Sequence, residues 1–449
     1  MTRFPPSASA VAAEDDRREH RPMQTRAVVS GTLGSTLEWF DFAIYGALSA
    51  TLFPALFFSG LGETGSLLAS FASFGVGFVA RPLGGLIFGH LGDRYGRRPI
   101  LLGTFIAMGA SSIVIGLLPT GQGVAIAVLL VVMRFIQGFA LGGEATGAQL
   151  MTMEHAAGNR RGVLGSLMNV GSPLSQVIAN LTLVLLTSVL STENWEAWGW
   201  RIPFLASILL VAVGVYIRMK LEETPAFVVH KREGEAEKPN GLKVLAQQPL
   251  KIAQLTVGWG GPALTFYLIA VYGLSYLSDQ GVSSNDGFLI LMVANGVSVV
   301  FCVLGGWVSD RIGRKNVLLI GIAGCLAGVL LFFPVADTGA VGPAMAVVIL
   351  ALGSVQFGFG AQPALFAEQF PTSTRFSGSA LSLTFANLIF AAPAPMAATA
   401  LTEAGGSRTV MWVTVGILVA SALALLPLAD KRGVDLASFT TLTTGKDNA

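Results

Sequence analysis

The sequence predicts an all-α polytopic membrane protein with twelve transmembrane helices in two pseudo-symmetric six-helix bundles. Three observations lead to this fold class: the composition, the number of apolar stretches, and a motif that occurs twice. Of the 449 residues, 53% are hydrophobic and 12% are charged, whereas a soluble domain carries about 25% charged residues. So few charges argue against a soluble enzyme. The net charge of +2 argues against a nucleic-acid-binding protein, which needs a basic surface.

Twelve apolar stretches are long enough to cross a bilayer, which takes roughly 20 residues. Each is expected to be helical, because an open backbone would leave amide groups unpaired in hydrocarbon. The predicted spans lie at about residues 28–57, 65–90, 99–118, 123–150, 162–190, 199–219, 248–278, 286–308, 316–335, 342–366, 376–401 and 408–428.

The positive charges predict which side of the membrane each loop faces. Nearly all of the 28 Lys and Arg residues lie in the terminal segments and in alternate loops, and the opposite loops contain only Arg201 and Arg408. Because basic loops stay in the cytoplasm, both termini and the central loop are expected there. The predicted segments are an N-terminal tail (1–27), a first bundle (28–219), a central loop (220–247), a second bundle (248–428) and a C-terminal tail (429–449).

A charged loop motif occurs once in each half. Residues 89–98 read GHLGDRYGRR, and residues 306–315 read GWVSDRIGRK. The glycine before the final basic pair permits a tight turn, and the arginines supply fixed donors for carboxylates and helix ends. A weaker repeat pairs Glu154, Arg161 and Gly162 with Glu368, Arg375 and Gly378.

We expect this repeated loop to form a cytoplasmic gate that clasps the two halves together. Helix capping combined with positive-inside topology is the alternative explanation. The residues predicted to form the gate are Asp93, Arg94, Arg97, Glu144, Asp310, Arg311 and Arg314.

The doubled loop resembles the signature of the major facilitator superfamily. Further motifs resemble its metabolite:proton symporter branch, which includes permeases for shikimate, α-ketoglutarate, citrate, proline and betaine. The resemblance covers roughly residues 28–430 and implies two bundles that rock between inward- and outward-facing states, in the plasma (inner) membrane of a bacterium, to cotransport a small metabolite with protons. The motifs are LEWFDF (37–42), ARPLGG (80–85), RFIQG (134–138), GWRIPF (199–204), LEETPAF (221–227) and EQFPT (368–372).

Ionisable residues inside the predicted spans are confined to the first half. A charge at mid-bilayer costs about 2.5–3.5 kcal/mol even on the insertion scale, so each must pair, bind a proton or face water. They are Glu38, Asp41, Arg81, Arg134 and Glu144.

Glu38, Asp41 and Tyr45 share one face of the first helix. Glu38 and Arg134 are both expected near mid-depth, because their helices run in opposite directions. We expect Glu38 or Asp41 to carry the coupled proton, with Arg134 as the fixed countercharge, and the resemblance also links Arg134 to proton coupling. A purely structural buried salt bridge is the alternative.

Candidate substrate-binding residues come from both halves. Arg81 precedes Pro82 and is expected either to satisfy a carbonyl group that the proline frees or to bind a substrate carboxylate. Glycines around Pro262 predict a break in the seventh helix. The full set of candidates is Tyr45, Arg81, Arg134, Trp259, Tyr267 and Gln356.

These features predict a proton-coupled importer of a small polar metabolite, with an organic acid favoured because carboxylates pair bidentately with guanidinium groups. A zwitterion such as proline or betaine is the first alternative. Proton-driven drug efflux is the second alternative. It is less favoured, because Gly171-Ser172-Pro173 matches the fifth-helix motif of antiporters only in part. The sequence contains no metal-ligand spacing, nucleophile elbow or phosphate loop, so no enzymatic activity, metal or cofactor is expected. The expected partners are the substrate, protons and lipid, and the protein is expected to act as a monomer.

Overall fold

The computed structural model describes residues 39–95, 97–121, 123–142, 160–220, 245–371 and 374–432, together with residues 32 and 36. Within these ranges the chain is helical and no strand occurs. Glu38, Glu144, Gly96, the greater part of both tails and nearly all of the central loop lie outside the described residues. The same holds for the side chains of Asp93, Arg94 and Arg97.

The first half begins with a helix that is described from residue 39 to residue 51. It continues through α2 (Phe53–Phe57), η1 (Ser59–Leu61), α3 (Gly62–Tyr95), α4 (Arg97–Leu117), α5 (Val124–Leu141), α7 (Arg161–Asn169), α8 (Gly171–Val189), α9 (Thr192–Asn194), η2 (Trp195–Gly199) and α10 (Arg201–Lys220).

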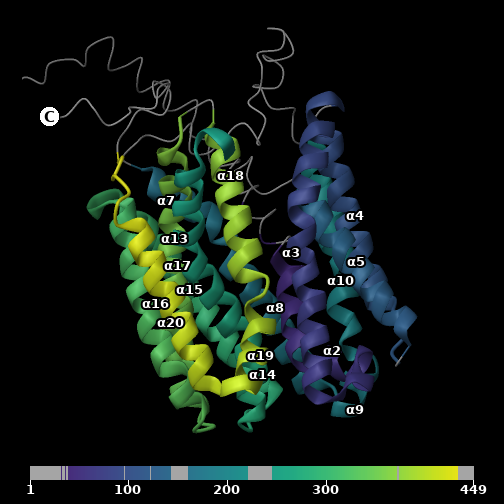
Figure 1. Cartoon of the computed structure of the whole chain (residues 1–449). Helices are drawn as coiled ribbons and strands as arrows, with labels where there is room; N and C mark the ends of the chain where they lie inside the picture. The colour runs from purple at the N-terminus through teal and green to yellow at the C-terminus, as the bar shows by residue number, and fades with distance from the viewer. Residues whose placement is uncertain are drawn as a thin grey trace, which may run out of the picture.

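The second half contains two π-helical segments, η3 and η4, which interrupt otherwise α-helical spans. Its elements are α13 (Pro249–Tyr267), η3 (Leu268–Tyr272), α14 (Gly273–Asp279), α15 (Ser284–Ile312), α16 (Arg314–Ala336), α17 (Val341–Gln369), α18 (Arg375–Ala386), η4 (Asn387–Ala391), α19 (Ala394–Gly405) and α20 (Ser407–Leu425). In Figure 1, α13, α15, α16, α17 and α20 gather on one side of the molecule and α3, α4, α5 and α10 on the other.

Each of the twelve predicted spans is helical over most of its described residues. Nine helices of the described ranges are long and apolar enough to cross a membrane. The remaining three predicted spans correspond to the first helix, to α4 with its apolar segment Leu102–Leu117, and to α10. Large apolar side chains such as Leu86, Val124 and Leu209 point outward, as expected of a protein that crosses a bilayer several times.

Paired glycines bring the same two helices of each half into backbone contact. A β-carbon at Gly84 of α3 would overlap the carbonyl oxygen of Phe139 in α5, and one at Gly142 would overlap that of Arg81. The second half repeats this crossing between α15 and α17, where Gly305 meets the carbonyl group of Phe357. Small residues permit such close approach of membrane helices.

The expected break in the seventh helix is wrong. The α-helix α13 runs without interruption through Pro262, because Gly258 and Gly261 serve to pack it tightly on α20 and the Gly261 amide donates a 2.9 Å hydrogen bond to Ser421 Oγ. The irregular segment comes later, in the π-helix η3. Such π-segments commonly lie at functional sites.

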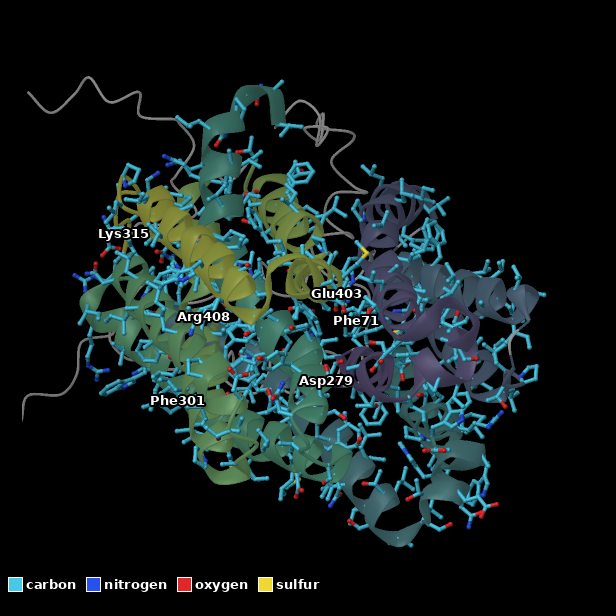
Figure 2. The ribbon with its side chains drawn as sticks, turned by 60° about the horizontal axis from the view of Figure 1, so that its bottom comes forward. Phe71, Asp279, Phe301, Lys315, Glu403 and Arg408 are labelled. Atoms are coloured by element: carbon cyan, nitrogen blue, oxygen red, sulfur yellow. The ribbon has the colours of Figure 1, made fainter. Side chains whose placement is uncertain are left out.

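The two halves meet along different helices at the two ends of the molecule. At the upper end of Figure 1, α7 packs against α15 and α17, and α8 continues along α15. At the lower end, α3 packs on α19, and Thr64 Oγ1 donates a 2.8 Å hydrogen bond to Glu403. Figure 2, which looks onto that end, labels Glu403 and the α3 residue Phe71 where the two halves meet.

The glycine crossing generates a stability prediction. Gly84→Ala places a methyl group on the Phe139 carbonyl oxygen, so we expect it to destabilise the fold by about 1–3 kcal/mol, the usual cost of overpacking. Gly103→Ala on α4 is the matched control, because a β-carbon there meets no atom within 4 Å. Thermal unfolding of the purified protein measures both variants. Equal midpoints for the two would contradict a tight crossing of α3 and α5.

Candidate functional site

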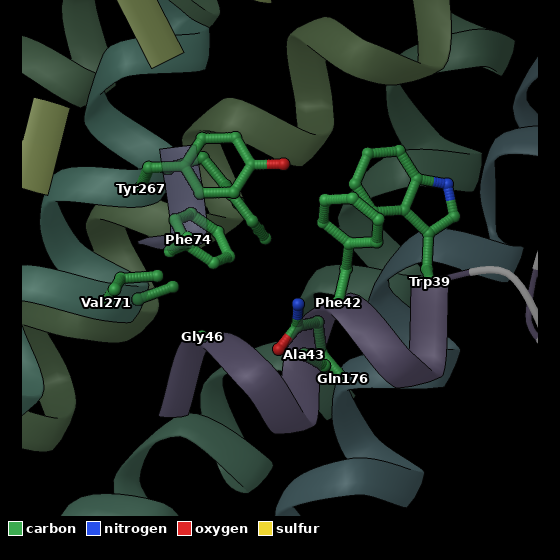
Figure 3. Close-up of a pocket in the computed structure, with 10 residues that line it drawn as sticks. Trp39, Phe42, Ala43, Gly46, Phe74, Gln176, Tyr267 and Val271 are labelled. Atoms are coloured by element: carbon green, nitrogen blue, oxygen red, sulfur yellow. The ribbon is translucent and has the colours of Figure 1, made fainter. Parts of the chain in front are cut away.

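A narrow cavity lies between the two halves, lined by side chains from both of them. In Figure 3, Trp39 and Phe42 lie on one side of it and Tyr267 on the other, and the amide of Gln176 points in from α8. The complete lining is Trp39, Phe42, Ala43, Gly46, Phe74, Gln176, Phe266, Tyr267, Ala270 and Val271. The cavity is therefore mostly apolar and aromatic.

The register of the first helix separates the cavity from a buried polar network. Trp39, Phe42, Ala43 and Gly46 follow the i, i+3, i+4, i+7 spacing of one helix face, and this face lines the cavity. Asp41 lies on another face and points into the first bundle. The helix thus carries an aromatic wall on one side and a carboxyl group on another.

Side chains from three helices surround Asp41, which is 2% exposed. Ser112 of α4 donates a short hydrogen bond to its Oδ2, and Ser207 of α10 donates to its Oδ1 at 2.7 Å. Gln137 of α5 donates to Oδ2 at 3.4 Å and to Ser112 Oγ at 2.8 Å. Three donors therefore compensate this carboxyl group for the water it has lost.

Arg134 reaches this network through Gln137. Its Nη1 donates to Gln137 Oε1 at 2.6 Å, whereas Nε and Nη2 have no hydrogen-bond partner among the described residues. The guanidinium carbon lies 3.8 Å from the ring centroid of Phe42 and 4.2 Å from that of Tyr45. Gly77 makes room for it, since a β-carbon there would lie 3.0 Å from Arg134 Nε.

The predicted pairing of Asp41 with Arg134 therefore takes an indirect form. Within the described ranges no ion pair joins the two residues, and the Gln137 side chain bridges them. Glu38, the other proposed proton carrier, lies outside the described residues. Arg81 also contacts the aromatic wall. Its guanidinium carbon lies 4.2 Å from the ring centroid of Phe42 and 5.2 Å from that of Trp39. Two guanidinium groups thus flank Phe42.

Of the six predicted substrate contacts, Tyr267 lines the cavity, and the other five, which include Arg81 and Arg134, are not among its lining residues. Tyr45 is fully buried behind the wall, where its hydroxyl group shares a 2.8 Å hydrogen bond with Ser73. Trp259 stacks on Phe359, with 5.5 Å between ring centroids, and Gln356 is buried in α17. The substrate-binding roles of these residues therefore stay predictions.

Several residues of the site were not predicted. Trp39 and Phe42 lie inside the quoted LEWFDF motif, and their helical spacing was a signal that could have identified them. Gln137 lies in RFIQG, one turn from Arg134. Ser112 and Ser207 leave no such signal, because single serines are common in membrane helices.

The second copy of the loop motif joins the two halves. Asp310 accepts hydrogen bonds from the amides of Gly162 and Val163, at 3.0 and 3.1 Å, at the start of α7. Gly313 adopts φ of 101°, and the next residue, Arg314, returns to Asp310 at 2.6 Å. Asp310 therefore holds both an arginine of its own half and a helix N-terminus of the other.

Glu368 extends this contact, which we call the clasp and define as Arg161, Gly162, Asp310, Arg314 and Glu368. Arg314 approaches Glu368 at 3.3 Å, and Arg161 of the first half approaches it at 3.8 Å. Both arginines and Glu368 are almost completely buried. The weaker sequence repeat contained Arg161 and Glu368 but gave them no role in the gate.

Arg311, a predicted gate residue, lies outside the clasp. Its side chain is exposed, stacks on Trp307 with 3.4 Å to the ring centroid, and donates to the Trp307 carbonyl group. Arg311 follows Asp310 directly, and one residue along a helix turns a side chain by about 100°. Its side chain therefore points away from the clasp, on the outer face of α15. Glu144 and the side chains of Asp93, Arg94 and Arg97 lie outside the described residues, so the first-half gate stays a prediction.

Comparison with known proteins identifies the family. The model of the Major Facilitator Superfamily matches residues 31–393. The chain belongs to this superfamily. It is 34% identical to the inner membrane metabolite transport protein YhjE of Escherichia coli K12, over 85% of this chain and 89% of that protein. It is 33% identical to the proline/betaine transporter of Salmonella typhimurium, over 81% and 75% of the two chains.

Two further similarities fit the same family. The chain is 32% identical to the shikimate transporter of Escherichia coli K12, over 89% of this chain and 94% of that protein. The crystal structure of a D-xylose-proton symporter superposes with a TM-score of 0.73 at 18% identity, over 91% of this chain and 99% of that one. The superposition confirms the predicted fold class, and the family model and the relatives confirm the resemblance to the superfamily.

The clasp generates a prediction about the accessibility of Cys302. This thiol is fully buried where α15 meets α7, with its sulfur 3.6 Å from the Ser166 carbonyl oxygen. Asp310→Asn replaces one of the two oxygens that accept from the Gly162 and Val163 amides with an NH₂ donor, so the interface should open more often. We expect Cys302 to react several-fold faster with N-ethylmaleimide in a Cys325→Ser background. Arg311→Gln is the matched control, and acceleration by the control alone would contradict the clasp.

Proposed function

We propose that this superfamily member is a proton-coupled symporter that imports a small organic acid by alternating access. The observation that carries the proposal is the buried carboxyl group of Asp41, linked through Gln137 to Arg134 immediately behind the cavity wall. A carboxyl group so far from water is costly as a permanent charge. A residue that gains and loses a proton during each cycle accounts for that cost.

The serines around Asp41 support two protonation states. Ser112 Oγ also lies 3.1 Å from the Met108 carbonyl oxygen, and Ser207 Oγ lies 3.4 Å from that of Pro203. Each hydroxyl group can therefore donate either to a charged Asp41 or to its own helix. When Asp41 carries a proton, a serine oxygen is free to accept a hydrogen bond from the protonated carboxyl group. The network can thus bind a proton without leaving a buried donor unsatisfied.

The position of Phe42 supports coupling between proton and substrate. Its ring lines the cavity and contacts the guanidinium groups of Arg81 and Arg134. A substrate that moves this ring also changes the surroundings of Arg134, and through Gln137 those of Asp41. Coupling requires that one ligand alter the affinity for the other, and this chain of contacts supplies a physical route.

The clasp and the α3–α19 contact support alternating access. They join the two halves at opposite ends of the molecule, and a cavity between the halves opens to one side when one contact breaks. We further propose that the protein resides in a bacterial inner membrane with both termini in the cytoplasm, and that it works as a monomer with no cofactor. The inner-membrane location follows the printed name of the YhjE relative.

An organic acid is favoured by the two guanidinium groups that flank Phe42, since carboxylates pair with guanidinium. Shikimate, proline and betaine, for which relatives are named, all contain a carboxylate group. A zwitterionic solute is the second candidate, because two of these three compounds also carry a positive charge.

Replacing the proposed proton carrier should abolish uphill transport. We expect Asp41→Asn to reduce accumulation driven by an imposed ΔpH at least tenfold, because the amide cannot bind and release the proton. Exchange of substrate across the membrane, which moves no net proton, should persist. Proteoliposomes with radiolabelled benzoate, shikimate, proline and betaine provide the measurement on each compound that the unmodified protein takes up faster than protein-free liposomes do, and Asp286→Asn at the exposed start of α15 is the control. Full ΔpH-driven uptake by both Asp41→Asn and Glu38→Gln would overturn the proposal.

The serines should set the pH dependence of transport. Ser112→Ala or Ser207→Ala removes a donor to the charged carboxylate of Asp41, which favours its protonated form. We expect the pH of half-maximal uptake to rise by about one unit, since a hydrogen bond to a charged group contributes about 1.5–3 kcal/mol. Ser111→Ala is the matched control, because Ser111 is buried on α4 but donates to Ala107. An unchanged profile in both serine variants would remove the hydroxyl groups from the proton site.

A further inference from the structure

We propose that the cavity binds a monocarboxylate whose body is a flat aromatic or unsaturated ring. The ring stacks between the aromatic walls, and the carboxylate lies on the side of Phe42, toward the two guanidinium groups. The inference names the substrate class of the transport site and therefore rests on the proposed function.

The walls of the cavity match a flat ring. Half of the ten lining residues are aromatic, and they come from both halves of the protein. Phe74 and Phe266 both contact Tyr267, at 5.8 and 5.1 Å between ring centroids. Aromatic groups at such distances favour offset or edge-to-face packing with a further ring. A planar ligand can add to this cluster without any wall having to supply new polar groups.

The lining offers few partners for a polyhydroxylated ligand. Gln176 supplies its one amide side chain, and the phenol of Tyr267 and the indole of Trp39 are its other polar groups. Each hydroxyl group of a ligand that enters without a partner loses its hydrogen bonds to water at a cost. The cavity therefore selects against molecules that carry hydroxyl groups around the whole ring or chain.

The charges behind the wall favour an anion. Neither an acidic nor a basic side chain is among the ten lining residues. The guanidinium groups of Arg81 and Arg134 lie 4.2 and 3.8 Å from the Phe42 centroid, whereas Asp41 faces the serines on another side of the first helix. The field at the Phe42 side is therefore positive, and it acts through a low-dielectric wall.

Arg134 supplies donors for the carboxylate. Its side chain is fully buried, and Nε and Nη2 have no hydrogen-bond partner among the described residues. The Phe42 ring lies between this guanidinium group and the cavity. A carboxylate that displaces the ring exchanges a cation–π contact for a charged hydrogen bond, which is the stronger interaction. Phe42 thus acts as a movable screen between substrate and proton site.

The same arrangement disfavours the two nearest rivals. Aromatic walls attract a quaternary ammonium group, but here the two guanidinium groups repel it and none of the ten described lining residues carries a carboxylate. A dicarboxylate would leave its second charge among apolar walls, with the Gln176 amide as its strongest partner. An apolar ring with a single negative charge at one end matches both the apolar walls and the positive potential on the Phe42 side.

Binding of small probes to the purified full-length protein tests the inference. The probes are benzoate, benzamide, cyclohexanecarboxylate and glycine betaine, with affinity measured by isothermal titration calorimetry. We expect benzoate to bind at least tenfold more tightly than benzamide, which lacks the charge, and several-fold more tightly than cyclohexanecarboxylate, which lacks the flat ring. Glycine betaine should neither bind nor compete. Phe74→Leu should weaken benzoate about tenfold, and Phe288→Leu, a buried phenylalanine of α15 outside the cavity, should leave it unchanged.

Three results would overturn the inference: no binding of benzoate, equal binding of benzoate and benzamide, or binding of betaine without benzoate. Failure of the proposed function gives a different result. Benzoate that binds but enters under an imposed ΔpH no faster than into protein-free liposomes would reject proton symport and leave the ligand class standing. Accumulation of betaine driven by ΔpH without binding of benzoate would retain symport and reject the ligand class.

Discussion

The cost of burying charge at membrane depth governs the arrangement of this protein. Asp41, Arg134, Arg314 and Glu368 each lie at most 2% exposed, and each is held by hydrogen bonds, rings or a partner of opposite charge. The compensation differs between the two halves. In the second half carboxylate and guanidinium meet directly, as in the 3.3 Å contact of Arg314 with Glu368. In the first half Asp41 is held by neutral donors and Arg134 by aromatic rings. Direct pairs suit a structural contact, and neutral donors suit a group that changes its charge.

Much of the fold follows from the sequence, because apolar stretches, basic loops and a doubled motif each reflect a constraint of the bilayer. The contacts of Asp310 with α7 and Arg314 agree with the predicted contact between the halves, and its role as a gate stays a prediction. The break expected near Pro262 does not form, because glycine has two uses in a membrane helix, and close packing on α20 outweighs flexibility there. Sequence spacing alone does not distinguish these uses.

Side-chain direction explains the remaining differences between prediction and structure. The sequence predicted that Glu38, Asp41 and Tyr45 share one face of the first helix, and it did not indicate which face lines the cavity. Asp41 and Tyr45 point into the first bundle, and the neighbouring Trp39 and Phe42 form the wall. Trp259 and Gln356 are likewise buried within the second half. The rotation of each helix about its axis depends on its neighbours, and a single sequence carries little of that information.

The glycine crossings described above also have a mechanical consequence. Where the backbones of α3 and α5 touch at Gly84 and Gly142, neither helix can slide past the other without atoms colliding, so the two tilt as one stiff beam. One end of this beam, at Thr64, meets α19, and its middle carries Arg134. A tilt that begins at the contact with α19 would therefore displace the buried guanidinium group as well.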